Sequence, residues 1–194
     1  MDSSHSLLTI WFGSDDLHSA IDDAHIGAWF RSDAAFDQDL RLSFEDDVRA
    51  AKAGLRDDRA ATSAGALALL LLLDQLPRNI YRKDARQFES DAHARHIADL
   101  ALQRGLDQGV SPLRRAFFYL PFEHAEDLAN QDRSVALFTP LAAELGDLGK
   151  SYLAFAEKHR DVIRRFGRFP HRNALLGRAS TPDEAQFLEG GRGF

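Results

Sequence analysis

A segment near the C-terminus concentrates groups that bind anions. Residues 165–173 read RFGRFPHRN, and residues 176–178 read LGR. Planar guanidinium groups bind carboxylates and phosphates through paired hydrogen bonds. A purely solvated charge run would not need the interleaved phenylalanines, and a core segment would not need the arginines. We therefore predict a half-buried loop that holds an anionic ligand. The candidate ligand-binding residues of this loop are Arg165, Arg168, Arg172, Asn173 and Arg178.

These arginines have two possible kinds of partner. Arginine does not lose its charge in a folded protein, so a partly buried guanidinium needs a carboxylate or a ligand. Candidate carboxylates elsewhere in the chain are Asp74, Glu123, Glu126 and Asp127. The loop is therefore either a structural salt-bridge network or an anion site, and the sequence leaves both open.

A second polar motif, DQLPRNIYR at residues 74–82, follows directly after an apolar run. Polar groups in this position are expected to be partly buried and to need partners. Asp74, Arg78, Asn79 and Arg82 are candidate ligand-binding residues. The simpler alternative is that Asp74 pairs with Arg78 and that Asn79 caps the next turn.

A third motif, PFEHAED at residues 121–127, carries the usual proton-exchanging groups. Glu123, His124 and Glu126, together with His171, are the candidate catalytic residues. If Pro121 opens a helix, Glu123 and Asp127 share one face of it. Carboxylates in a first helical turn also simply complement the helix dipole.

His159 lies on an apolar helical face with Tyr152, Phe155 and Ile163. Such a histidine is usually a core residue, but this helix leads into the arginine-rich loop, so we include His159 among the ligand-binding candidates. A metal site of Glu123, His124 and His159 is a minor alternative, since the spacing matches no metal motif. We predict neither a metal nor a cofactor.

The elements that must position these residues read as helices. Asp33 is expected to cap a helix that ends at Gly54, and Ser63 to cap a central buried helix over 64–73 that Pro77 ends. Further helices are expected over 84–103, after Ser111-Pro112, over 134–145 and 151–166, and after the capping box at Thr181–Glu184. No segment alternates with a two-residue period. The prediction is an all-α fold in a single domain, residues 1–194.

Composition narrows the class of protein. There are no cysteines, which excludes disulfides and thiolate chemistry. Residues 1–60 carry 6 Lys+Arg against 13 Asp+Glu, whereas residues 161–194 carry 6 against 4. A nucleic-acid binder usually shows a broad basic face, so we expect no nucleic-acid partner. No signal or membrane-spanning segment is apparent, so we expect a soluble, cytoplasmic protein with no membrane partner. The oligomeric state stays open.

The motifs together resemble a bacterial family, domain-of-unknown-function family 924. The resemblance runs from residues 11–13 and 29–30 through 73–82 and 119–127 to His159 and residues 165–173, 176–178 and 180–181. It implies a single all-helical domain similar to tetratricopeptide-like superhelical folds, and no established activity. One departure is the sequence RAATSAG at 59–65, where the family usually has a tryptophan and a proline–glycine step.

Two functions from different classes fit these features. The first is a pocket lined by Arg, His and Glu that binds a small carboxylate or phosphate, as in a hydrolase or lyase. The second is a non-enzymatic helical scaffold that binds an acidic peptide or protein. A closed cavity would favour the first, and an open groove the second.

Overall fold

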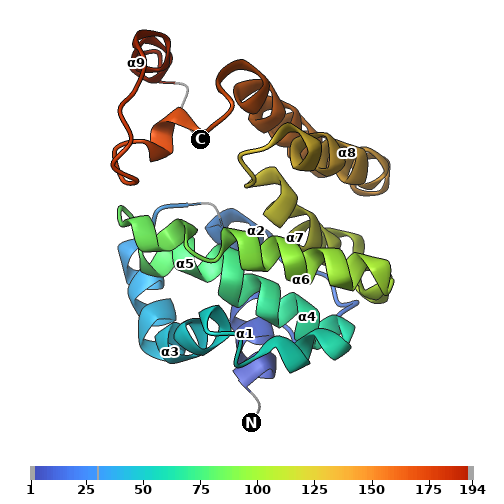
Figure 1. The fold of residues 1–194 in the computed structure, drawn as a ribbon. Helices are drawn as coiled ribbons and strands as arrows, with labels where there is room; N and C mark the ends of the chain where they lie inside the picture. Colours follow the sequence, from blue (N-terminus) through green and yellow to red (C-terminus); the bar gives the residue numbers. More distant parts are fainter. Residues whose placement is uncertain (1–2, 30, 192–194) are drawn as a thin grey trace. The chain divides into compact units, whose positions relative to one another are not determined.

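The structure, a computed structural model, describes residues 3–29 and 31–191, and within these ranges the chain forms helices and no strand (Figure 1). The predicted all-α class is confirmed. In the described residues, no helix is both long and apolar enough to cross a membrane. The likeness to tetratricopeptide folds stays a prediction.

The chain forms two compact units. The first unit comprises Met1–Arg82 and Arg86–Pro121, and the second comprises Lys83–Ala85 and Phe122–Phe194. That residues 1–194 form one domain stays a prediction. The helices of the first unit are α1 (Ser3–Phe12), α2 (Asp23–Trp29), α3 (Ala34–Lys52), α4 (Ser63–Leu70), α5 (Leu76–Ile80), α6 (Asp91–Gln103) and α7 (Pro112–Glu123), of which the last two residues belong to the second unit.

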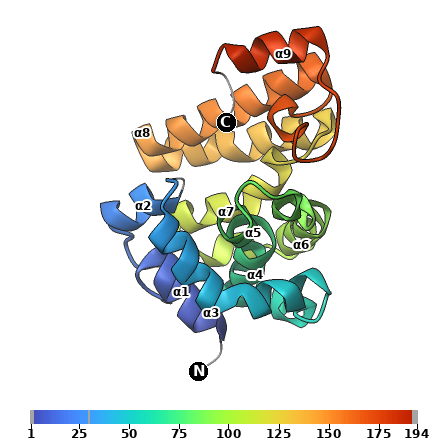
Figure 2. The ribbon, with the colours of Figure 1, turned by 90° about the vertical axis from the view of Figure 1, so that its left-hand side faces the viewer.

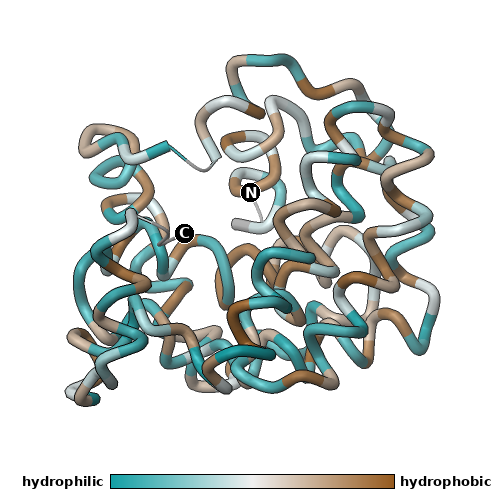
Figure 3. Tube along the Cα trace, turned by 90° about the horizontal axis from the view of Figure 1, so that it is seen from above, coloured by the Kyte–Doolittle hydropathy of each residue, from teal (hydrophilic) through white to brown (hydrophobic). Residues whose placement is uncertain are grey.

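The core of the first unit is built around α4, whose residues from Ala66 onward are buried. This agrees with the prediction of a central helix that is apolar all round. The cap differs from the prediction, because Thr62 and not Ser63 accepts the hydrogen bond from the Gly65 amide, at 3.1 Å. Hydrophobic and hydrophilic residues are mixed along most of the trace, as the colours of Figure 3 show.

Pro77 does not end the central helix, contrary to the prediction. The chain passes from α4 through one wide π-helical turn, Leu71–Gln75, directly into α5, with Pro77 at the start of α5. In an α-helix a proline at 77 leaves the carbonyl of Leu73 without an amide donor. The Ser90 hydroxyl donates to that carbonyl at 2.6 Å instead. The wider turn and this hydroxyl together let the helix continue.

The second unit is built on α8 (Leu128–Phe166) and α9 (Pro182–Glu189). Gly146, with φ 60° and ψ −132°, breaks α8 into two halves, which agrees with the two helices predicted here. The halves run antiparallel, since Phe138 stacks on Tyr152 at 5.8 Å and Asp132 lies 3.8 Å from Arg160 (Figure 2). The capping box of Thr181 and Glu184 is confirmed at α9.

Candidate functional site

The residues around Phe169 bring together several of the predicted site residues, all within the second unit. The fully buried Phe169 ring lies 5.5 Å from the His159 ring and 5.6 Å from the His171 ring. The Arg172 guanidinium carbon lies 4.6 Å from its centre, and the His124 ring is 6.4 Å from that of His159. We call Glu123, His124, His159, His171 and Arg172, around Phe169, the Phe169 cluster.

Glu123 and His159 form the buried centre of the Phe169 cluster. Glu123 is 4% exposed and His159 is 9% exposed. His159 Nδ1 lies 3.1 Å from Glu123 Oε1 and 2.9 Å from the carbonyl oxygen of Phe155. Both oxygens can only accept, so Nδ1 carries the proton and the neutral ring has its lone pair on Nε2.

Burial lowers the pKa of His159 to about 3, and the nearby His124, His171 and Arg172 act in the same direction. The bonded carbonyl of Phe155 opposes this shift, and the carboxylate of Glu123 must do the same. The net direction is downward because the ring is removed from water on nearly all sides. Burial also raises the pKa of the Tyr152 hydroxyl, with the charge of Glu123 adding to the effect. We take His159 as neutral at pH 7, because its own pKa lies far below that value.

Arg172 brings a permanent positive charge to the cluster. Its side chain is buried, stacks over Phe169 and donates from Nη2 to the carbonyl oxygen of His124 at 3.1 Å. That bond fixes the guanidinium against the chain that carries His124. Arg172 is thus held in a fixed position, and its role in binding an anion stays a prediction.

The local sequence explains how these side chains are positioned. Pro121 lies inside α7, which ends at Glu123, so it does not open the helix on which a face shared by Glu123 and Asp127 depended. Asp127 does not share a helical face with Glu123 either, since it caps α8 by accepting from the Asn130 amide at 2.9 Å. Gln131, fully buried, donates to the carbonyls of Glu123 and Ala125 at 2.6 and 2.8 Å.

The sequence analysis did not identify Gln131, whose two hydrogen bonds fix the loop between α7 and α8. A glutamine that follows a helix cap by one turn is ordinarily a surface residue, so no signal in the sequence marked it. On the other side of the cluster, Gly167 ends α8 with φ 71°, and the short turn Pro170–Arg172 follows. These two connections place His124 and Arg172 beside the end of α8.

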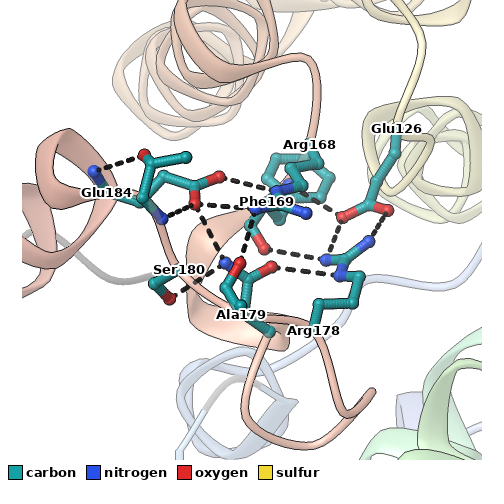
Figure 4. Close-up of polar contacts among 9 residues, drawn as sticks. Glu126, Arg168, Phe169, Arg178, Ala179, Ser180 and Glu184 are labelled. Atoms are coloured by element: carbon teal, nitrogen blue, oxygen red, sulfur yellow. Dashed lines mark hydrogen bonds and ion pairs between the residues drawn. The ribbon is translucent and has the colours of Figure 1, made fainter.

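Two further arginines of the loop, Arg168 and Arg178, pair with carboxylates, as the salt-bridge alternative expects (Figure 4). Arg178 donates to both oxygens of Glu126, at 2.6 and 2.9 Å. Arg168 donates to both oxygens of Glu184, at 2.6 and 2.8 Å. Asn173 donates to Glu184 and to Ser180 and accepts from Arg178.

Glu126, predicted as catalytic, is held as a carboxylate in this network. Burial alone would raise its pKa, but the hydrogen bonds from Arg178 and from the Phe169 amide, the latter 2.7 Å long, outweigh burial and lower it. A carboxylate that accepts from these donors anchors the loop and is poorly suited to exchanging a proton. The geometry favours a structural role for Glu126.

Arg165 is exposed, and its guanidinium carbon lies 4.7 Å from the centre of the neighbouring Phe166 ring. It does not join the Phe169 cluster. No group of three or more His, Cys, Asp or Glu side chains within residues 3–29 and 31–191 is placed to hold a metal ion. The alternative metal site of Glu123, His124 and His159 therefore finds no support.

The motif at residues 74–82 lies in the first unit, where its arginines also pair with carboxylates. Arg78 binds both oxygens of Asp91, at 2.9 and 3.1 Å, and its Nη1 lies 3.4 Å from Asp74 Oδ1. The charges of Asp91 and Asp74 raise the pKa of Arg78 against its burial. The expected Asp74–Arg78 pair is present, and Asp91 is an additional partner.

Arg82 and Asn79 share a single carboxylate. Arg82 binds both oxygens of Asp37, at 2.7 and 3.0 Å, and Asn79 donates to the same group at 2.8 Å. Asn79 therefore ties α5 to α3 rather than capping the next turn. Asp37 and Asp91 lie far from this motif in the sequence, so charge alone could not identify them as the partners.

A comparison with known protein families identifies one family. The chain matches, over residues 7–192, the family described as bacterial proteins of unknown function. The structure of a protein of unknown function from Agrobacterium tumefaciens is similar to it, with a TM-score of 0.83 and 44% identity over 97% of each chain. No curated protein matches the chain. The protein therefore belongs to the bacterial domain-of-unknown-function family 924.

Proposed function

We propose that the Phe169 cluster binds a small carboxylate or phosphate and exchanges a proton with it, in a reaction of the hydrolase or lyase class. The observation that carries the proposal is the buried Glu123–His159 pair, with Nδ1 and Oε1 3.1 Å apart, held beside the fixed guanidinium of Arg172. Ion pairs with carboxylates account for Arg168 and Arg178. The Phe169 cluster instead gathers three histidines around a buried arginine.

The charge of the cluster supports an anionic ligand. Arg172 is always cationic, and His124 and His171 gain positive charge when they are protonated. All three groups lower the pKa of His159, so each acts electrostatically on the same ring. An anion bound among them would be stabilised by this positive potential.

The Glu123–His159 pair supplies the means of moving a proton. Glu123 and the Phe155 carbonyl hold the Nδ1 proton, which keeps Nε2 of His159 in the accepting form. A carboxylate that orients a histidine in this way is the usual support of a general base. In this proposal the charge of the bound anion raises the low pKa of His159, so that His159 accepts the proton and His124 or His171 donates one.

A thermal-melt screen tests the ligand class. The untagged protein is melted with phosphate, sulfate, dicarboxylates, nucleotides and phospho-sugars, beside Arg172→Ala and the matched control Arg165→Ala. A ligand at about a hundred times its Kd stabilises by about 2.7 kcal/mol, a shift of several degrees for this size. We expect the shift in the parent and in Arg165→Ala, and its loss in Arg172→Ala.

Arg172 is buried, so its removal could also unfold the loop. Arg172→Lys keeps the charge and loses the paired donors, and it is expected to fold and to bind the anion more weakly. If neither variant differs from the parent in ligand response, the anion proposal is wrong. A melting shift with a polyglutamate peptide, and with none of the small anions, would instead support the scaffold alternative.

A further inference from the structure

The aromatic residues Trp11 and Trp29 play no part in the proposed function, yet they line a cavity in the first unit. The cavity has a volume of about 200 Å³, and Ile10, Ala28 and Phe36 also line it. Its walls come from α1, α2 and α3. Apolar cavities of about 150 Å³ are large enough to bind benzene. This cavity therefore has room for a single six-membered ring with a small substituent.

The walls are fixed before any ligand arrives. The Trp29 indole donates to the Trp11 carbonyl oxygen at 2.7 Å. Both indoles pack against Phe117, with ring centres 6.1 Å away for Trp11 and 4.9 Å away for Trp29, in edge-to-face geometry. Rigid aromatic walls lose little conformational entropy when a ring binds between them.

His25 is the polar residue among those that line this cavity. Its Nδ1 lies 2.8 Å from Asp22 Oδ1, and a carboxylate oxygen can only accept, so Nδ1 holds the proton and a neutral ring accepts at Nε2. Gly13 makes room for this ring, because a Cβ at that position would meet His25 Cε1 at 3.0 Å. The positive φ of 79° at Gly13 also favours glycine.

We propose that this tryptophan pocket binds a small, neutral ring compound whose hydroxyl or N–H group donates to His25. The ring packs between Trp11 and Trp29, and the donor meets the acceptor nitrogen of His25. An anionic occupant is disfavoured because residues 1–60 carry 13 Asp+Glu against 6 Lys+Arg. The ligand is therefore chemically distinct from the anion proposed for the second unit.

Phenol is the probe that tests this inference, with toluene as the ring that lacks the donor. The chain has two tryptophans, and both line the pocket, so the two indole N–H resonances report on it directly by NMR. We expect saturable shifts of these resonances with phenol in the full-length protein. One hydrogen bond should make phenol bind about five- to tenfold more tightly than toluene.

Variants separate specific binding from general adsorption. The larger side chain of Ala28→Leu fills the cavity and leaves less space for the phenol ring. Phenol binding should therefore weaken at least about tenfold, which corresponds to about 1.4 kcal/mol. Gly27→Ala is the matched control on the same helix, because a Cβ there meets nothing within 4 Å. His25→Leu should erase the preference for phenol over toluene, and His25→Gln, which keeps an acceptor, should retain part of it.

The outcomes are distinct from those of the anion screen. No saturable shift with phenol, or equal binding in Ala28→Leu and Gly27→Ala, overturns the inference. Binding of phenol and toluene with the same affinity overturns the role of His25. If Ala28→Leu does not fold, the comparison of His25→Leu with His25→Gln still decides that role, since neither variant adds volume to the α2 helix.

Discussion

Glu184 is a buried carboxylate whose charge depends on its partners. The hydrogen bond from Arg168, with help from the Thr181 amide, lowers its pKa from 4.5 to about 2, although burial opposes the shift. A lowered pKa contributes stability that is fully present above pH 4.5 and is lost as the pH falls towards 2. Glu184 thus links the start of α9 to the arginine-rich loop only while it is ionised.

We expect Glu184→Gln to remove this acid-sensitive part of the stability. The variant should melt at a lower temperature than the parent at pH 7, and the difference should shrink as the pH falls below 4.5. Melting curves between pH 3 and 7 measure the effect. Glu189→Gln, which alters an exposed carboxylate at the end of the same helix, should follow the parent curve. A constant difference at every pH would contradict the prediction.

His159 gives a prediction in a different pH window. Its pKa is about 3 in the folded protein against an ordinary 6.5, so only the unfolded chain binds the proton between these values. Stability should therefore fall as the pH drops from 6.5 towards 3. In an NMR titration the His159 ring signals should stay constant between pH 8 and 5. A midpoint near 6.5 would contradict this prediction.

At the level of the helices, the sequence predicts those caps and helix ends that are set by residues close together in the chain. The caps at Asp33 and Thr181 and the glycine stops are local hydrogen-bond patterns, and they occur as expected. The helices α1 and α2 were not predicted, because α1 has neither an acidic first turn nor a basic last turn and α2 is very short. Local patterns cannot reveal a donor supplied from a distant residue.

Pro77 shows that limit most clearly. The proline reads locally as a helix end, but a wide turn and the Ser90 hydroxyl, thirteen positions further on, allow the helix to continue. In the candidate site, too, the partners of a residue are distant from it in the sequence. The residue types of the site can be recognised in the sequence. Which of them form pairs depends on distances that only the folded chain sets, as in Glu123–His159, Glu126–Arg178 and Arg168–Glu184.

Ser90→Ala tests the continuation of the central helix. The change leaves the buried carbonyl of Leu73 without its donor, and an unsatisfied buried group costs about 1–3 kcal/mol. The free energy of unfolding, measured in urea, should fall by this amount. Ser43→Ala, an exposed serine of α3, should change it by less than about 0.5 kcal/mol. A loss at Ser90 no larger than that at Ser43 would mean that the wide turn alone accommodates the proline.

Gly149 controls how closely the halves of α8 approach each other. A Cβ at this position would lie 2.7 Å from Ala142 Cα and 2.8 Å from the Leu141 carbonyl oxygen, which are backbone atoms that cannot swing aside. We expect Gly149→Ala to destabilise the protein by about 1–3 kcal/mol. Gly27→Ala should instead be neutral or stabilising by up to about 1 kcal/mol, because alanine favours a helix. Urea unfolding of both variants provides the comparison.

For the whole molecule, the decisive question is whether the two compact units unfold together. The sequence predicts a single domain, since 194 residues is short for two. The chain also passes between the units more than once, because Lys83–Ala85 belongs to the second unit while the residues on either side belong to the first. A chain interleaved in this way is hard to separate into independently folding parts.

Tryptophan fluorescence makes this prediction testable without any substitution. Both tryptophans lie in the first unit, so their emission follows the unfolding of that unit alone. Far-UV circular dichroism follows the helices of both units, including α8 and α9. We expect the two signals to give the same midpoint and the same slope in urea, as a cooperative single domain requires. Separate midpoints would show two domains, and the stability changes predicted for Ser90→Ala and Gly149→Ala would then each appear in only one transition.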